Sequence, residues 1–188
     1  MPSNANSQVL RPLLSDVADL VGAHQTGKTG NKGRQWHLSG VNRAIVVMAV
    51  SAWEAYVEHV VVEAVDAMKP STAPMGPWPS LKASVSAAKG RFNTPNSQNV
   101  RGFVRDSIGL DDVTKAWSWQ ATKPAAAVQR LDATLKLRHQ IAHGVHPRPV
   151  VQHSTAKGLP VLVQKLADCT DGAIRDYLVS SLGVTVGW

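Results

Sequence analysis

The segment from Ser39 to Met68 is expected to form one continuous helix. Ser39 is a suitable N-cap residue, and the seven residues at positions 44–50 are all apolar. Thirty helical residues would extend about 45 Å. A helix that is apolar on all sides over its first half must be covered by other elements. The segment is therefore predicted to be the long central helix, and the most buried element, of the fold.

The remaining segments also show helical spacing, and two short runs of valine are too short to build a sheet. Pro124 is tolerated in a first helical turn, Gly144 is suited to end a helix, and Pro147 forbids its continuation. The predicted fold class is all-α, a bundle of about five to six helices. Helices are predicted over residues 9–21, 39–68, 81–89, 97–108, 124–143 and 160–182.

A length of 188 residues fits one domain. Residues 9–188 are predicted to form it, and the polar residues 1–8 are expected to be a flexible tail. The single cysteine, Cys169, excludes an internal disulfide. No secretory signal is visible, and the longest uncharged apolar stretch, residues 44–53, is shorter than the roughly 18 residues of a membrane span. A cytoplasmic protein without a membrane partner is expected.

Basic residues outnumber acidic ones by 20 to 13, and their distribution is uneven. Three stretches, residues 20–53, 67–105 and 133–167, contain no acidic residue but hold fifteen of the twenty basic ones. Basic clusters without neutralising neighbours favour a polyanionic partner, most simply RNA. The residues expected to contact RNA are Lys28, Lys32, Arg34, Lys136 and Arg148.

Groups suited to catalysis gather near the end of the helix predicted over residues 124–143. Arg138 and His143 lie about 7.5 Å apart along the axis and about 140° apart around it, so they flank one edge of the helix. A histidine exchanges protons near neutral pH, and an arginine holds a phosphate through two parallel hydrogen bonds. Together they suit RNA cleavage by its own 2′-hydroxyl without a metal. The alternative is that both are ordinary residues at a helix end.

Residues 138–144 (RHQIAHG) resemble the R-x4-6-H signature of HEPN domains, which are small all-helical domains of bacterial toxin–antitoxin and antiviral systems. The polar residue that typically follows the arginine is His139 here. Residues 51–58 (SAWEAYVE), which include Glu54, resemble a segment of the HEPN subfamily named after RiboL-PSP proteins. The resemblance covers about residues 8–182. It implies a HEPN-like bundle that forms a C2 homodimer, in which two motifs build one composite site.

The resemblance implies a metal-independent endoribonuclease without a cofactor. Arg138 would bind and neutralise the scissile phosphate, His143 would transfer a proton, and His139 would orient them or the phosphate. Glu54 would bridge Arg138 or His143 from the neighbouring helix; otherwise it is simply the polar edge of a core helix. The implied role is the toxic effector of a toxin–antitoxin or antiviral pair, with an antitoxin or sensor protein as partner. The alternative is a catalytically silent module for RNA binding or dimerisation, controlled by a partner protein.

Residues 22–29 (GAHQTGKT) match the Walker A pattern letter for letter. A working P-loop follows a buried strand and opens a helix. Residues 13–21 instead show helical spacing, and Gly30 and Gly33 cannot open a regular helix. Residues 22–34 are therefore predicted to be a flexible basic loop, and a P-loop nucleotide-binding protein is the less favoured alternative.

His139 and His143 also have the spacing of a helical zinc pair. The glutamate that serves as general base in the HExxH motif is replaced here by Gln140, so zinc-dependent hydrolysis lacks its proton acceptor. No metal site is predicted.

Overall fold

The computed structural model describes residues 1–27, 38–72 and 76–188. These ranges are built from helices and contain no strand, only an isolated antiparallel bridge between Trp119 and Thr122. The all-α prediction is confirmed. In chain order the elements are η1 (Ala5–Leu10), α1 (Arg11–Thr26), α2 (Ser39–Ala67), α3 (Trp78–Lys89), α4 (Ser97–Ile108), η3 (Val113–Ala116), α5 (Pro124–Ala142) and α6 (His153–Leu182).

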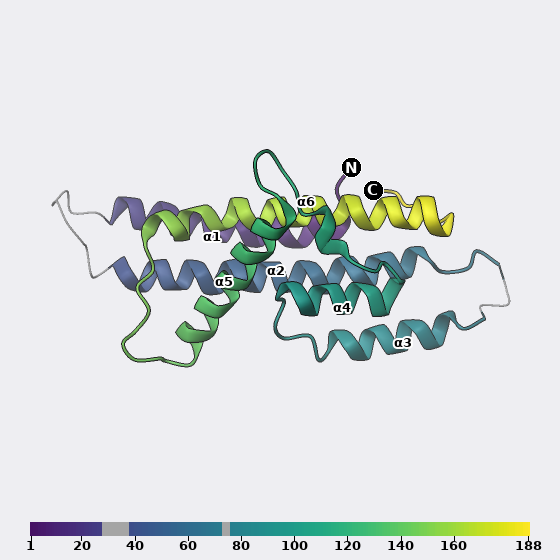
Figure 1. The fold of residues 1–188 in the computed structure, drawn as a ribbon, viewed down its shortest axis with the longest axis horizontal. Helices are drawn as coiled ribbons and strands as arrows, with labels where there is room; N and C mark the ends of the chain where they lie inside the picture. Colours follow the sequence, from purple (N-terminus) through teal and green to yellow (C-terminus); the bar gives the residue numbers. More distant parts are fainter. Residues whose placement is uncertain (28–37, 73–75) are drawn as a thin grey trace.

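Helix α2 is the central element, as predicted. It packs against α1, α3, α4, α5, α6 and η1. Figure 1 shows α1, α2 and α6 running along the long axis, with α5 crossing them obliquely and α3 and α4 beside one half of α2. By length and composition α2 could also cross a membrane, but 56% of its most apolar window is buried inside the protein, as in the core helix of a globular fold.

Two buried tryptophans connect α2 to its neighbours. The Nε1 of Trp53 donates a hydrogen bond to the carbonyl oxygen of Pro95 at 2.9 Å, and the Nε1 of Trp117 donates to Oγ1 of Thr170 at 3.0 Å. The two rings meet edge to face with centroids 5.9 Å apart. Because both polar atoms have partners, the rings can be fully buried. This packing holds the segment before α4 against Trp53 of α2, which is the residue next to Glu54.

The N-terminal residues do not form the flexible tail that was predicted for residues 1–8. Ser3 and Asn6 are fully buried. The backbone N–H and hydroxyl of Ser3 donate hydrogen bonds to the carboxylate of Asp171, and the backbone N–H of Ala5 donates to Glu63. These carboxylates take up N–H groups that the first turn of a helix leaves without a partner. The polar composition of the segment therefore reflects a buried network rather than exposure to water.

Three helices, α1, α3 and α6, are longer than predicted, and α3 begins at Trp78 rather than at residue 81. Residues 22–26 were expected in a loop, but they form the end of α1. Helix α6 begins at His153, seven residues before the predicted start at Pro160. Ala156 and Leu159 are buried and continue the apolar stripe of α6 ahead of the proline. Packing of this stripe outweighs the loss of one helical hydrogen bond at Pro160.

Candidate functional site

The carboxyl end of α5 carries the R-x4-H segment and lies at the edge of the molecule, beyond α2 (Figure 1). The helix ends at Ala142 with His143 as its C-cap residue, and Gly144 has a φ of 62°. The N–H of Val145 bonds to the carbonyl of Gln140 at 3.2 Å, and that of Gly144 bonds to the carbonyl of Ile141 at 3.3 Å. These two bonds form a Schellman end, which favours glycine at the left-handed position. Gly144 ends the helix as predicted and leaves His143 in its last turn.

His139 and His143 are both exposed and lie one turn apart on the same face of α5. Their ring centroids are 4.1 Å apart, with the ring planes tilted by 46°. Two adjacent imidazoles facing solvent are well placed to exchange protons with a bound substrate. In the described part of the chain, no three histidine, cysteine, aspartate or glutamate side chains come together as metal ligands would.

Arg138 lies half-buried on α5, near enough to Glu54 of α2 for its charge to act on that carboxyl group. Its Nε is buried and has no hydrogen-bond partner among the described residues. Burial raises the pKa of Glu54; the positive charge of Arg138 opposes this rise, and the negative charge of Glu58 adds to it. No ion pair within 4.0 Å joins Arg138 and Glu54 in the described structure. The carboxylate therefore acts on the guanidinium through its charge, and Arg138 has no ion-pair partner among the described residues.

The residues predicted to contact RNA fall into two groups. Lys136 and Arg148 are exposed, and neither forms an ion pair with a described residue. Lys136 lies on α5 beside the motif, and Arg148 follows the end of that helix. Lys28, Lys32 and Arg34 lie outside the described residues.

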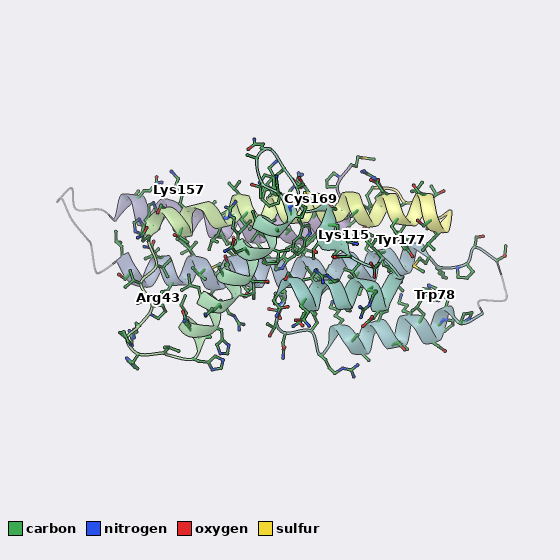
Figure 2. The ribbon with its side chains drawn as sticks, in the orientation of Figure 1. Arg43, Trp78, Lys115, Lys157, Cys169 and Tyr177 are labelled. Carbon is green, nitrogen blue, oxygen red and sulfur yellow. The ribbon has the colours of Figure 1, made fainter. Side chains whose placement is uncertain are left out.

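Positive charge is less available in one of the basic stretches than its sequence suggests. Most basic side chains of residues 67–105 pair with carboxylates from other positions, whereas those of residues 133–167 form no ion pair within the described ranges. Unpaired positive charge thus accumulates where α5 ends and α6 begins. Arg43 and Lys157 lie in the half of the molecule that contains these two helix ends (Figure 2). The pairs are Lys82–Asp66 (2.6 Å), Lys89–Glu58 (3.7 Å), Arg101–Asp112 (3.0 Å) and Arg105–Asp106 (3.0 Å).

A cavity of about 500 Å³ opens beside His139, between α5 and the beginning of α4. It is lined by Lys136 on the α5 side and by Asn96 and Gln98 on the α4 side. These two amides belong to no motif, so sequence reasoning did not identify them. Only the packing of α4 against α5 brings them next to the motif.

The Walker A match does not form a P-loop in its described part. Residues 22–26 are the last turn of α1, and the residues before them are helical as well. The strand that must precede a phosphate-binding loop is therefore replaced by a helix. Lys28 and Thr29 lie outside the described residues.

The family model for RiboL-PSP-HEPN matches residues 13–176. This range includes Glu54 and the whole R-x4-H segment. No curated protein and no solved structure matches the chain significantly. Because the match covers most of the sequence and the chain folds as an all-helical domain, this protein belongs to the RiboL-PSP-HEPN family.

Proposed function

We propose that the protein is a metal-independent endoribonuclease in which Arg138 and His143 are the catalytic residues. HEPN domains include ribonucleases, so membership of the family supports an RNA-related role. The observation that carries the proposal is the arrangement at the end of α5. There an arginine that forms no ion pair with a described residue precedes two exposed, adjacent histidines.

The proposed reaction is attack of a ribose 2′-oxygen on the adjacent phosphorus, which breaks the bond to the 5′-oxygen of the next nucleotide. The products are a 2′,3′-cyclic phosphate and a 5′-hydroxyl. Arg138 binds the non-bridging phosphate oxygens and offsets the charge that develops on them. His143 transfers a proton, and His139 orients the phosphate or the neighbouring ring. Glu54 is a positioning residue that acts on Arg138.

The reaction needs one group to take the proton of the 2′-hydroxyl and another to give a proton to the leaving oxygen. A C2 homodimer with its two α5 ends facing each other supplies two copies of Arg138 and His143 to one site. We therefore include the homodimer in the proposal. It also gives the exposed histidines a second wall that excludes water.

The biological role follows from the family resemblance. We propose that the nuclease is the toxic effector of a toxin–antitoxin or antiviral pair, held in check by an antitoxin or sensor protein. Its substrate would be cytoplasmic RNA. The second candidate is a catalytically silent module for RNA binding or dimerisation. The exposure of both His139 and His143 on a single chain favours this candidate.

The test is incubation of wild type, Arg138→Ala and His143→Ala with total RNA and tRNA in excess EDTA. His59→Ala is the matched control, since His59 is an exposed histidine of α2 whose Nδ1 lies 2.7 Å from the Ala55 carbonyl oxygen of its own helix. We expect cleavage with 2′,3′-cyclic phosphate ends by the wild type and the control alone. Equal cleavage by all four proteins, or cleavage that EDTA stops, would overturn the mechanism. Intact RNA that still binds the wild type would favour the silent module.

A further inference from the structure

The cavity beside His139 has rigid walls and free polar groups. The backbone N–H and hydroxyl of Ser97 donate hydrogen bonds to Asp132 at 2.8 and 2.7 Å, which attaches the first residue of α4 to α5. Gln98 and Lys136 also line the cavity. Both side chains are exposed, and neither has a hydrogen-bond or ion-pair partner in the described part of the chain. The groups available to a ligand are thus carried by a wall that is fixed before the ligand arrives.

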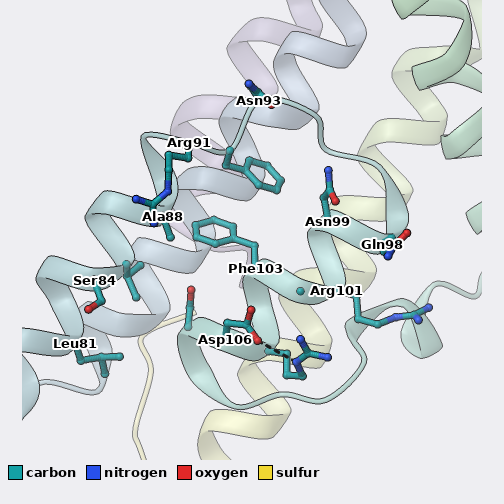
Figure 3. A pocket seen from close by; sticks show the side chains of 15 residues that line it. Leu81, Ser84, Ala88, Arg91, Asn93, Gln98, Asn99, Arg101, Phe103 and Asp106 are labelled. Carbon is teal, nitrogen blue, oxygen red and sulfur yellow. Dashed lines mark hydrogen bonds and ion pairs between the residues drawn. The ribbon is translucent and has the colours of Figure 1, made fainter.

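Gln98 also lines a second cavity, of about 750 Å³, between α3 and α4. Figure 3 shows this cavity with Arg91 on one side and Gln98 and Asn99 on the other. The rings of Phe92 and Phe103 stack in its wall, with centroids 4.9 Å apart. Phe92 is only partly buried, so it offers an aromatic surface to a ligand.

The second cavity carries an available positive charge. Asp106 is held by Arg105 at 3.0 Å, and Arg101 is held by Asp112 at 3.0 Å. Arg91 is exposed and has no ion-pair partner among the residues described. The cavity therefore keeps one available positive charge, while its aspartate is neutralised.

Gly102 of α4 lines the same cavity, and a Cβ built on it would meet nothing within 4 Å. Neither packing nor a positive φ requires glycine at this position. Glycine inside a helix is less stable than alanine. A glycine here keeps the backbone of α4 open to close approach by a ligand.

We propose that the two cavities form one groove, here called the α4 groove, that binds single-stranded RNA on one side of the scissile phosphate. The inference rests on the proposed nuclease function and names its substrate subsite. Lys136 binds a phosphate next to the cleavage site, and the amide of Gln98 reads the edge of an unpaired base. A further base stacks on Phe92, and Arg91 binds a phosphate at the far end. The groove thus makes the nuclease prefer unpaired RNA.

The experiment measures RNA binding in the His143→Ala background, so that cleavage does not interfere. The probe is a fluorescein-labelled single strand of mixed sequence, about 12 nucleotides long, within the usual site sizes of such proteins. Gly102→Glu places a negative charge in the groove, and Lys136→Ala removes a positive one. The matched controls are Gly172→Glu, at a helical glycine of α6 whose Cβ also meets nothing within 4 Å, and Lys123→Ala, at an exposed lysine just before α5.

We expect both groove variants to bind at least about fivefold more weakly than the background, and both controls to stay within about twofold. Lys136→Ala should also lower the slope of log affinity against log salt by about 0.7, the value for one phosphate contact on a single strand. Gln98→Ala should weaken binding without changing that slope. Equal thermal midpoints show that the variants fold alike. Equal losses in groove and control variants, or unchanged binding by the groove variants, would overturn the proposal.

The result separates the groove from the nuclease. If wild type cleaves RNA in EDTA while the groove variants bind normally, the groove is wrong and the nuclease stands. If wild type does not cleave RNA while the groove variants lose affinity, the groove stands and the nuclease is wrong.

Discussion

Replacing Tyr56 by phenylalanine tests the network that joins α2, α6 and the N-terminal turn. Tyr56 is fully buried, and its Oη lies 2.7 Å from the Asp171 carboxylate and 2.9 Å from the carbonyl oxygen of Ala167. Burial, followed by the negative charge of Asp171, raises the pKa of Tyr56 well above its usual value, so the hydroxyl remains a donor. Phenylalanine keeps the ring packing and removes only this donor.

A hydrogen bond to a charged group contributes about 1.5–3 kcal/mol to stability. Asp171 keeps its donors from Ser3, so we expect a loss of about 2 kcal/mol in the free energy of unfolding. For a chain of this size that corresponds to a fall in Tm of about 4–8 °C. Urea titration followed by circular dichroism measures the loss, and a thermal scan checks the shift.

The matched control is Tyr177→Phe. Tyr177 lies on the same α6 as Asp171, and its hydroxyl makes no hydrogen bond to a described residue. The control should change the free energy of unfolding by no more than about 0.5 kcal/mol. A loss at Tyr56 that does not exceed the control would refute the account of the network.

Three further predictions concern the N-terminal segment and the site. Deleting residues 2–7 removes donors from the carboxylates of Asp171 and Glu63, and should lower the free energy of unfolding by at least about 3 kcal/mol in a urea titration; an unchanged midpoint would contradict this. The pKa of Glu54 is raised in the folded protein, so the folded state binds a proton at this carboxyl group more readily than the unfolded state does. Above the raised pKa, the ionised carboxylate therefore lowers the free energy of unfolding. Glu54→Gln should therefore be more stable than wild type at pH 7, by less than about 1 kcal/mol because the group is partly exposed. A pH series of urea titrations should show this advantage disappear as the pH falls through the raised pKa. A stability difference that stays constant with pH would argue against the raised pKa of Glu54. Arg138→Lys should lower single-turnover RNA cleavage about 10²–10³-fold with little change in stability, because lysine cannot bind a phosphate through two parallel hydrogen bonds; cleavage within about twofold of wild type would count against the role of the guanidinium.

The helices that could be predicted from the sequence are those whose limits depend on local signals. The predicted and observed bounds of α4 agree, Ser97 to Ile108, because Asn96 caps its start and Gly109 ends it in a left-handed conformation. Helix α2 starts at Ser39, but Leu38 rather than Ser39 occupies its N-cap position and no side chain caps it, whereas Gly144 ends α5 as predicted. A local rule misled the prediction at Pro160, where burial of the preceding turn decides the outcome.

The pairing of charges, by contrast, does not depend on local signals in the sequence. A stretch without acidic residues in the sequence still finds acidic partners in space, because Asp66, Glu58 and Asp112 come from other parts of the chain. The burial of Ser3 has the same origin, since its partner Asp171 is 168 positions away. Sequence spacing carries no information about pairings of this kind until the helices have been packed.

The candidate site combines both situations, and this explains how much of it could be predicted. Arg138, His139 and His143 lie on one helix, so their relative placement follows from helical geometry and the capped end at Gly144. The charges of Glu54 and Arg138 act on each other only because α2 packs against α5, and the family resemblance rather than the spacing pointed to Glu54. Of the α4 groove the sequence pointed only to Lys136, since three separate segments build it. The arrangement of residues on one helix end can thus be predicted from a motif, whereas the surface proposed to select the RNA depends on how the whole bundle packs.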